Sequence, residues 1–225
     1  DRTGHGTHLA ATIAGKGKGG AGAPGTGVAP KADLLVGKVL NSSGSGDLSW
    51  VIAGMEWAVG QGARIVNLSM GAEAFEGPDA ASEAVDALSA SSGALFVVAA
   101  GNSGPGAQTV TTPGTASSAL TVGAVSKSDT MATFSGRGPR LGDGAVKPEV
   151  TAPGVAIVAA RAAGTTLGEP IDKAYTSMSG TSMAAPHVAG AAALLAQRHP
   201  DWKAPQLKAA LVASAEPVKG AEVWE

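Results

Sequence analysis

Three short segments, far apart in the chain, carry side chains that together could perform acyl transfer. His5, in the segment GHGTH, offers a general base, and Asn102, which ends the segment AAGN, offers an amide donor. Ser182, in the segment GTSMA, offers a hydroxyl nucleophile. Acyl transfer needs this set, because a base must take the serine proton while donors meet the oxyanion of the tetrahedral intermediate.

Ser182 stands where a turn of small residues opens into a long apolar run. The run from Met183 to Ala196 contains no Asp, Glu, Lys or Arg, so it predicts a helix buried on all sides and capped by the Thr181 hydroxyl. In the first turn of such a helix, the N–H of Ser182 lacks a helical partner and lies at the positive end of the dipole. It could therefore donate to an oxyanion. Taken alone, Thr181 and Ser182 could equally be no more than a helix cap.

The rest of the chain alternates apolar runs of strand length with helical patterns. The expected strands are 34–40, 64–69, 95–100, 120–125 and 155–160; the other expected helices are 9–14, 48–59, 78–92 and 205–213. Strands that alternate with helices predict an α/β fold, with a parallel sheet covered on both faces. Because such folds bind ligands at the carboxyl ends of their strands, we expect Ser69 and Asn102 to lie at the site.

In this order, the three segments resemble the histidine, oxyanion and serine motifs of the subtilases, the subtilisin-like serine proteases. The resemblance covers essentially all 225 residues, including DLSW from Asp47 and NLSMG from Asn67. It implies a three-layer fold with a mostly parallel sheet flanked by helices, and a serine endopeptidase acting on polypeptides. It also implies that His5 is the general base, that Ser182 forms the acyl-enzyme, and that the Asn102 side chain and the Ser182 N–H form the oxyanion hole.

The resemblance further implies which residues hold the substrate. They are Ser69, Met70 and Gly71 on one side of it, Gly44, Ser45 and Gly46 on the other, and Ala99, Ala100 and Gly101 in a wall of the pocket for the residue before the scissile bond. Thr111 stands in the side wall of that pocket, where the family often has glycine. We therefore expect a shallow pocket and a preference for small or medium apolar side chains.

The chain departs from the family at its beginning. Subtilases place an aspartate at the end of a strand well before the histidine, whereas Asp1 is only four residues ahead of His5. The resemblance thus implies a partial peptidase domain over residues 1–225, truncated at both ends, with its N-terminal strands, catalytic aspartate and C-terminal end missing. Loss of the orienting carboxylate costs about 10⁴ in rate, and the missing strand, which is central to the family's sheet, would expose a buried edge. We therefore expect this span alone to be poorly folded and nearly inactive.

Two other classes of function stay open. GTSMA also resembles a degenerate nucleophile elbow, which would suggest an α/β-hydrolase-type esterase with its histidine after the serine. However, His187 would point about 140° away from Ser182, and His199 would lie roughly 25 Å off. The other alternative is a catalytically inactive, subtilase-like binding module.

The amino-acid composition and the spacing of the histidines and glycines argue against several kinds of binding partner. A net charge of −2 without a basic stripe argues against nucleic acid and anionic membranes, and no apolar run reaches the ~18 residues of a membrane span. The chain has no cysteine, and His5 and His8 lack the spacing and the glutamate of a zinc helix, so we expect no metal site there and a packing role for His8. The glycine-rich stretch 15–20 follows a helix rather than a strand, so it is expected to be a loop and not a dinucleotide site.

The family resemblance carries some expectations that no motif tests. It implies an extracellular, secreted protein, a monomer, and an N-terminal propeptide in the precursor. It allows calcium, but the sequence has no Asp/Glu cluster that marks a site, and we expect Asp143 and Asp172 to be solvated loop residues.

Overall fold

The computed structural model describes residues 1–17, 25–77 and 79–218. The helices are α1 (His5–Ala14), α2 (Leu48–Gly60), α3 (Ala80–Ser92), α4 (Thr181–Arg198) and α5 (Ala204–Ala213). The strands are β1 (Ile65–Leu68), β2 (Leu95–Ala99), β3 (Leu120–Val125), β4 (Val150–Pro153), β5 (Ile157–Ala160), β6 (Glu169–Pro170) and β7 (Tyr175–Met178). Part of the predicted glycine-rich loop, and the predicted helix start at Pro78, lie outside the described residues.

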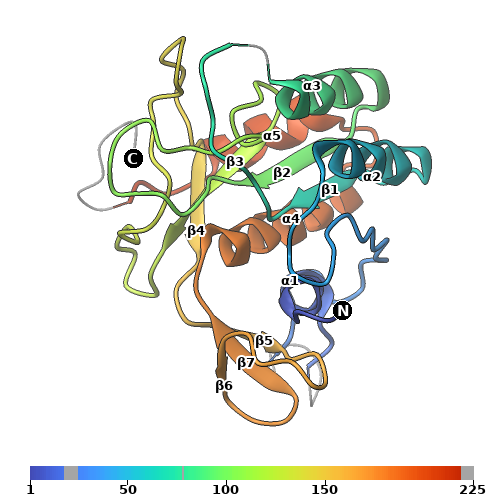
Figure 1. Ribbon diagram of the computed structural model, residues 1–225. Coiled ribbons are helices and arrows are strands. Elements are labelled where there is room, and N and C mark those ends of the chain that lie inside the picture. The colour runs from blue at the N-terminus through green and yellow to red at the C-terminus, as the bar shows by residue number, and fades with distance from the viewer. Residues whose placement is uncertain (18–24, 78, 219–225) are drawn as a thin grey trace.

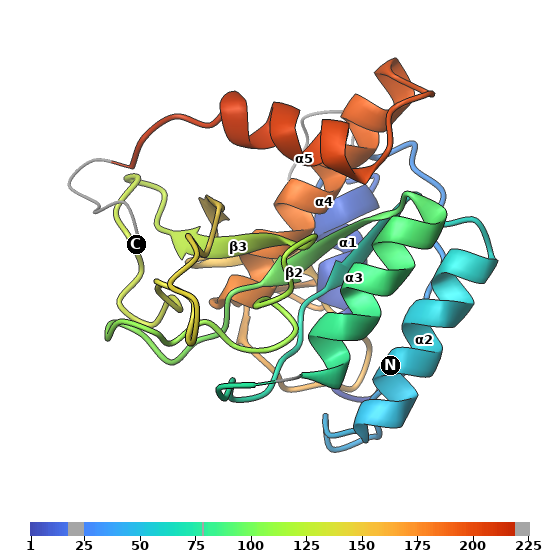
Figure 2. The same ribbon diagram turned by 90° about the horizontal axis from the view of Figure 1, so that it is seen from above.

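The main sheet is parallel and forms the middle of three layers. Its strand order is β1-β2-β3-β4, with Ile65 opposite Leu95 and Val97 opposite Leu120. Helices α2 and α3 cover one face, while α4 and α5 cover the other (Figures 1 and 2). The expected α/β fold is confirmed.

Alternation along β2 builds the two cores. All five of its residues are buried. Leu95 and Val97 pack into the cluster that includes α4 and α5, whereas Phe96 and Val98 pack into the cluster on α2 and α3. Because full burial of each large apolar side chain contributes about 1.5–3 kcal/mol, this strand is a main source of stability for both layers.

Helix α4 runs through the centre of the molecule and packs against all four parallel strands and α1. Its sequence is rich in Ala and Gly, which lets backbones approach closely. At Gly190 the approach is closest: a Cβ there would lie 2.6 Å from Cβ of Val28. The predicted helix is therefore confirmed, but it is not buried on all sides, because Leu194 within the run is 46% exposed.

A small antiparallel sheet, in the order β5-β7-β6, lies beside α1 and leads into α4 (Figure 1). Strand β7 ends at Met178, three residues before α4 begins. Strands β4, β6 and β7 were not predicted, since their sequences are short and interrupted by polar residues, Gly or Pro. They nonetheless fix the entry into the helix that carries Ser182.

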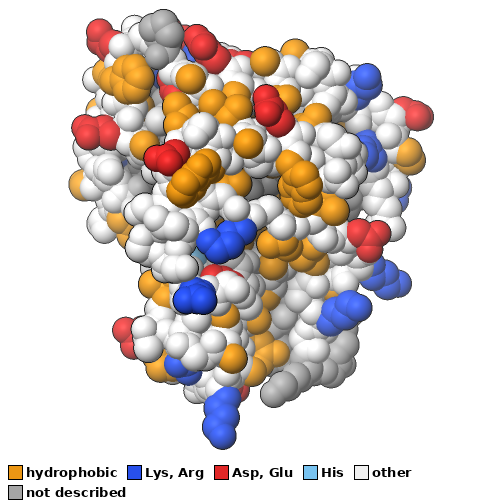
Figure 3. All heavy atoms as spheres, turned by 45° about the vertical axis from the view of Figure 1, so that its right-hand side comes forward, with side chains coloured by type: hydrophobic (Ala, Val, Ile, Leu, Met, Phe, Trp, Pro, Cys, Tyr) orange, Lys and Arg blue, Asp and Glu red, His pale blue; other side chains and the backbone are white. Residues whose placement is uncertain are grey.

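The strand expected at 34–40 is wrong. The described residues there form no ladder, and Leu35 and Val36 are 51% and 73% exposed. The segment instead lies along α2, where a Cβ at Gly37 would be 3.3 Å from the Trp57 ring. β1 is consequently an outermost strand of the described sheet, and hydrophobic side chains gather on the face seen in Figure 3.

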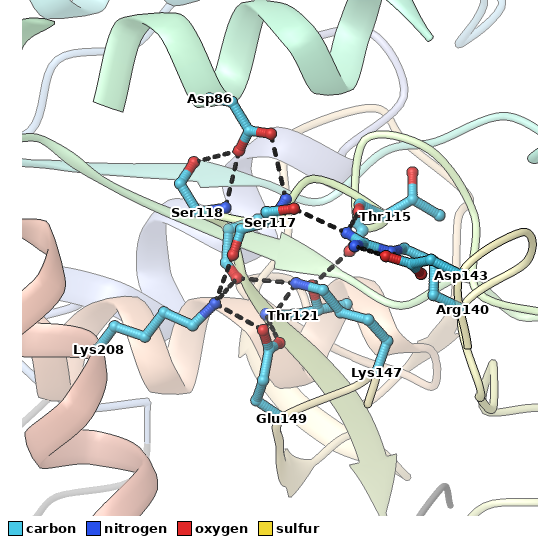
Figure 4. A network of polar contacts seen from close by, with 12 residues as sticks. Asp86, Thr115, Ser117, Ser118, Thr121, Arg140, Asp143, Lys147, Glu149 and Lys208 are labelled. Carbon is cyan, nitrogen blue, oxygen red and sulfur yellow. Dashed lines mark hydrogen bonds and ion pairs between the residues drawn. The ribbon is translucent and has the colours of Figure 1, made fainter. Parts of the chain in front are cut away.

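A charged network fastens α5 to the sheet (Figure 4). The Lys147 ammonium is buried and donates to Glu149 Oε1 (2.7 Å), the Ala119 carbonyl (3.0 Å) and Thr121 Oγ1 (3.0 Å). Lys208 of α5 donates to the same Glu149 oxygen (2.6 Å). Burial lowers the pKa of Lys147 to about 8, although Glu149 opposes that shift.

Among the described residues, no helix combines the length and the apolarity that crossing a membrane would require. Asp143, expected to be solvated, pairs with Arg140, which lowers its pKa. Asp172 accepts hydrogen bonds from the backbone N–H groups of Ala174 and Tyr175.

Candidate active site

Ser182 occupies the first turn of α4, as predicted, but the helix is capped differently. Gly180 is the N-cap residue, and it has no side chain with which to cap the helix. The Thr181 hydroxyl instead donates to Asn102 Oδ1 (3.1 Å) and accepts from the Gly101 N–H (3.1 Å). The hydroxyl that we expected to cap the helix therefore connects it to the end of β2.

These contacts orient the Asn102 amide. Its Oδ1 also accepts from the Thr181 N–H (2.9 Å), so the amide oxygen is held against α4 and Nδ2 is left to donate elsewhere. A Cβ placed on Gly180 would be 3.6 Å from Asn102 Nδ2 and 3.7 Å from Ser182 N. The Asn102 amide, whose Oδ1 is also 3.7 Å from that point, and the Ser182 N–H therefore both lie near Gly180.

Pro186 affects the backbone of Ser182. Proline has no N–H, so the Ser182 carbonyl, four residues earlier, loses its helical partner. The Ser69 hydroxyl, just after β1, donates to this carbonyl (2.9 Å). In return, the Ser182 hydroxyl donates to the Ser69 carbonyl (3.2 Å). The pair fixes the Ser182 peptide at the carboxyl end of the sheet.

His5 begins α1 and is brought to the same place as Ser182 and Asn102. The three residues line one cavity of about 500 Å³, the His5 cavity, together with residues from the small sheet. Burial lowers the pKa of His5, so its imidazole is favoured in the neutral form that a base requires. Within the described residues, no carboxylate contacts this imidazole.

The Asp1 carboxylate binds backbone N–H groups at the start of α1. Its carboxylate accepts from the backbone N–H groups of Thr3 (3.2 Å), Gly4 (3.0 Å) and Thr7 (2.7 Å). It therefore stabilises the start of α1, where the orphan donors and the positive end of the dipole favour an anion.

The other histidines lie away from the nucleophile's hydroxyl. His8 is buried, and its Nε2 bonds to the Ile157 carbonyl (2.9 Å), which ties α1 to β5. His187 Nδ1 bonds to the Met183 carbonyl within α4 (2.8 Å), and His199 stacks on Trp202 at the far end of that helix. The packing role expected for His8 matches this geometry.

A second cavity, of about 620 Å³, shares Ser182 and Asn102 with the first but is otherwise lined by different residues. We call it the Thr111 cavity; of the predicted substrate-binding residues it is lined by Met70, Gly71, Ala99, Gly101 and Thr111. Ser69 and Ala100 are buried behind these residues. Gly44, Ser45 and Gly46 form an exposed turn before α2 and line neither cavity in the described structure.

In the lining of this cavity, Thr111 lies between two glycines. Cβ atoms on Gly71 and Gly101 would come within 2.7 and 2.5 Å of its side chain. Its hydroxyl donates to the Ala100 carbonyl (3.3 Å), which fixes the rotamer. The side chain therefore occupies space that a glycine at this position would leave open.

The described residues include no group of three or more His, Cys, Asp or Glu side chains that could hold a metal ion.

The fold and the grouping of Ser182, Asn102 and His5 define an α/β protein with the side chains that acyl transfer requires. The model of the subtilase family matches residues 1–223, and the chain belongs to that family of serine proteases. The predicted resemblance is thus confirmed.

Relatives in this family support the same conclusion. The chain is 38% identical to serine protease AprX and 41% identical to subtilisin E, both of Bacillus subtilis (strain 168), with 92% and 96% of its length covered. It spans 52% and 51% of those proteins, about half of each. It is 42% identical to subtilisin DY of Bacillus licheniformis, covering 96% of this chain and 71% of that protein.

A solved structure shares the fold. A cold-adapted subtilisin-like serine proteinase superposes with a TM-score of 0.76 at 33% identity, covering 99% of this chain and 72% of that one.

Proposed function

We propose that this chain provides the catalytic residues of a serine endopeptidase. The convergence of the Ser182 hydroxyl, the Asn102 amide and the His5 imidazole on one cavity carries the proposal. Ser182 attacks the scissile carbonyl after giving its proton to His5, and the oxyanion accepts hydrogen bonds from Asn102 Nδ2 and the Ser182 N–H. His5 then protonates the leaving amine, and water releases the acyl group by the same path.

The roles of the two cavities follow from this chemistry. The leaving nitrogen must receive its proton from His5, so the leaving half of the substrate passes over the His5 cavity. The acyl half then lies toward the Thr111 cavity, whose lining does not include His5. Met70, Gly71, Ala99 and Gly101 would contact the acyl half there.

A fluorophosphonate probe tests the nucleophile. We expect it to label the full-length protein at Ser182, and Ser182→Ala to abolish labelling without loss of folding. Absence of labelling in a folded sample would favour an inactive binding module. Hydrolysis of esters without peptide bonds would favour the esterase alternative.

Thr111 would limit the residue before the scissile bond to small or medium apolar side chains. In a peptide panel, we expect kcat/KM to be higher for Ala and Leu than for Phe or Tyr. Thr111→Gly should raise cleavage after Phe and Tyr because it removes a side chain from the lining of the cavity and so enlarges it. Undiminished cleavage after aromatic residues by the unmodified protein would contradict this expectation.

We further propose that the carboxylate that orients His5 comes from outside this span. Asp1 is committed to the start of α1, which supports the proposal. We expect residues 1–225 alone to hydrolyse peptides about 10⁴-fold more slowly than the full-length protein. Ordinary peptidase activity of this span would overturn the proposal.

The proposal retains an extracellular location, a monomeric state and a propeptide in the precursor, as family resemblance implies. Recovery of the processed protein from the culture medium of its source, followed by N-terminal sequencing and sedimentation analysis, tests all three.

A further inference from the structure

Glu169 is an acidic residue in the lining of the His5 cavity. It is exposed, and it is the one Asp, Glu, Lys or Arg among the described residues lining that cavity. Burial lowers the pKa of His5, so at neutral pH the imidazole does not balance this negative charge. Within the described part of the chain, the Glu169 carboxylate makes no hydrogen bond or ion pair. The Glu169 carboxylate is therefore available to form an ion pair with a cationic group of a ligand.

The small sheet fixes the position of Glu169. In the β6-β7 ladder, Glu169 lies opposite Ser177, which also lines the cavity and precedes Ser182 by five residues. Residues directly opposite in an antiparallel pair have Cα atoms about 4.5–5.5 Å apart and project from the same face. The ladder thus ties the carboxylate to the strand that leads into the nucleophile's helix.

Gly168 brings the two strands close enough for this ladder. Its φ of +81° is in the left-handed region, and a Cβ there would lie 2.6 Å from the Ser177 carbonyl oxygen. Any other residue would push β6 away from β7. The position of Glu169 is consequently set by backbone geometry and not by a mobile loop.

Two basic residues lie near Glu169 in the sequence, Lys173 four residues after it and Arg161 eight residues before it. Within the described part of the chain, Lys173 forms no ion pair with Glu169, and Arg161 is bonded elsewhere. The Arg161 guanidinium donates to the Thr165 carbonyl (2.7 and 3.1 Å) and to the Asp172 carbonyl (3.4 Å). These bonds hold Arg161 just after β5, so it does not pair with the Glu169 carboxylate.

We propose that Glu169 determines specificity on the leaving side of the scissile bond, by selecting polypeptides with Lys or Arg at the first or second residue after that bond. This inference rests on the proposed function, because it needs the leaving half of the substrate to pass over the His5 cavity. An extended chain advances about 3.4 Å per residue, so these two residues stay within about 7 Å of the bond. Their long basic side chains can then reach the carboxylate.

The expected size of the preference for Lys follows from the solvent exposure of Glu169. A solvent-exposed ion pair is weak, so we expect kcat/KM for a Lys peptide to exceed that for its norleucine counterpart by about two- to fivefold. Salt screens such a pair. The preference should therefore disappear near 1 M salt, where the Debye length is about 3 Å.

Internally quenched peptides with one fixed acyl half test the inference in the full-length protein. Lys, norleucine or Glu is placed at each of the first two leaving positions, and kcat/KM is measured for the unmodified protein, Glu169→Gln and Glu169→Lys. We expect E169Q to abolish the Lys preference while cleaving the norleucine peptide normally, which also shows that it is folded. E169K should prefer the Glu peptide.

Glu73→Gln is the matched control, because it removes an exposed carboxylate from the lining of the Thr111 cavity. It should leave the leaving-side preference unchanged. Normal cleavage of the norleucine peptide without a Lys preference, or a Lys preference that survives in E169Q, would overturn the role of Glu169 alone. Failure of the unmodified protein to cleave any of the peptides, without fluorophosphonate labelling, would overturn the proposed function and this inference with it.

Discussion

Two hydroxyl groups hold Ser182 and Asn102 in place. The Ser69 hydroxyl binds the Ser182 carbonyl that Pro186 leaves without a helical partner, and the Thr181 hydroxyl binds Asn102 Oδ1. Neither group needs to touch a substrate. Each fixes where a reacting or donating atom lies, so a loss should affect the rate more than substrate binding.

Thr181→Val should lower kcat about fivefold with little change in KM. Valine has the same shape but cannot donate to Asn102, and one such hydrogen bond is worth about 1 kcal/mol.

Removing the amide itself by Asn102→Leu should cost about 10²- to 10³-fold in kcat, a magnitude known for subtilisin, itself a member of this family. Steady-state kinetics on a neutral peptide measure both.

Thr181→Ser is the control, since it retains the hydroxyl and should keep most of the activity. A T181V variant with unchanged kcat would show that the Asn102 amide is oriented without this contact.

His8 makes stability depend on pH. Burial lowers its pKa, so the unfolded chain binds the proton more tightly than the folded one does. Stability is then fully present above the unfolded pKa of about 6.5 and is lost as pH falls below it, by at most about 1.4 kcal/mol per pH unit. Urea unfolding at several pH values between about 5 and 7.5 should show this slope, and His8→Gln should reduce it. An equal slope in both proteins would contradict the assignment to His8.

At the scale of elements, close packing between α4 and its neighbours limits what the helix tolerates. Gly190→Ala should destabilise the protein by about 1–3 kcal/mol, because the new Cβ would collide with Val28. Gly60→Ala, at the end of α2, is the matched control: nothing lies within 4 Å of a Cβ there. It should be neutral or stabilise by up to about 1 kcal/mol. Denaturant unfolding compares the two, and equal effects would show that the approach at Gly190 relaxes freely.

Elements with strong local signals were predicted well. Caps, apolar runs and glycine stops located α2, α3, β2, β3 and α5 to within a few residues. The strand at 34–40 was predicted from its apolar pattern alone, whereas a strand also needs a ladder partner, and none is present among the described residues. β6 has two residues, one of them proline, and its position depends on β7 rather than on its own sequence.

At the scale of the whole molecule, the grouping of His5, Asn102 and Ser182 was predicted from family motifs and from the rule that strand ends meet at one edge. The contacts that refine this grouping were not. Thr181 was expected to cap the helix, and nothing in the sequence shows that its hydroxyl turns to Asn102 instead, because that choice depends on how β2 and α4 meet. Glu169 also went unnoticed, since only the fold brings it to the cavity.

The network around Lys147 should affect global stability at alkaline pH. Burial lowers its pKa to about 8, below the 10.5 of an unperturbed lysine, so the unfolded chain binds more protons between these values. Stability should therefore rise with pH across this window, by at most about 1.4 kcal/mol per pH unit. The measurement is the free energy of unfolding of the unmodified protein minus that of Lys147→Met, between about pH 8 and 10. A falling difference would mean that attraction to Glu149 outweighs burial.

The central place of α4 has a consequence for inactivation by heat. Ser182 is the second residue of a helix that packs against all four parallel strands, so it cannot loosen while the sheet stays covered. The protein should have no long-lived warm state in which the hydrophobic layers persist but the nucleophile is displaced. The loss of peptidase activity on heating and the cooperative unfolding transition would then occur at the same temperature, because both would follow the unfolding of the layers around α4.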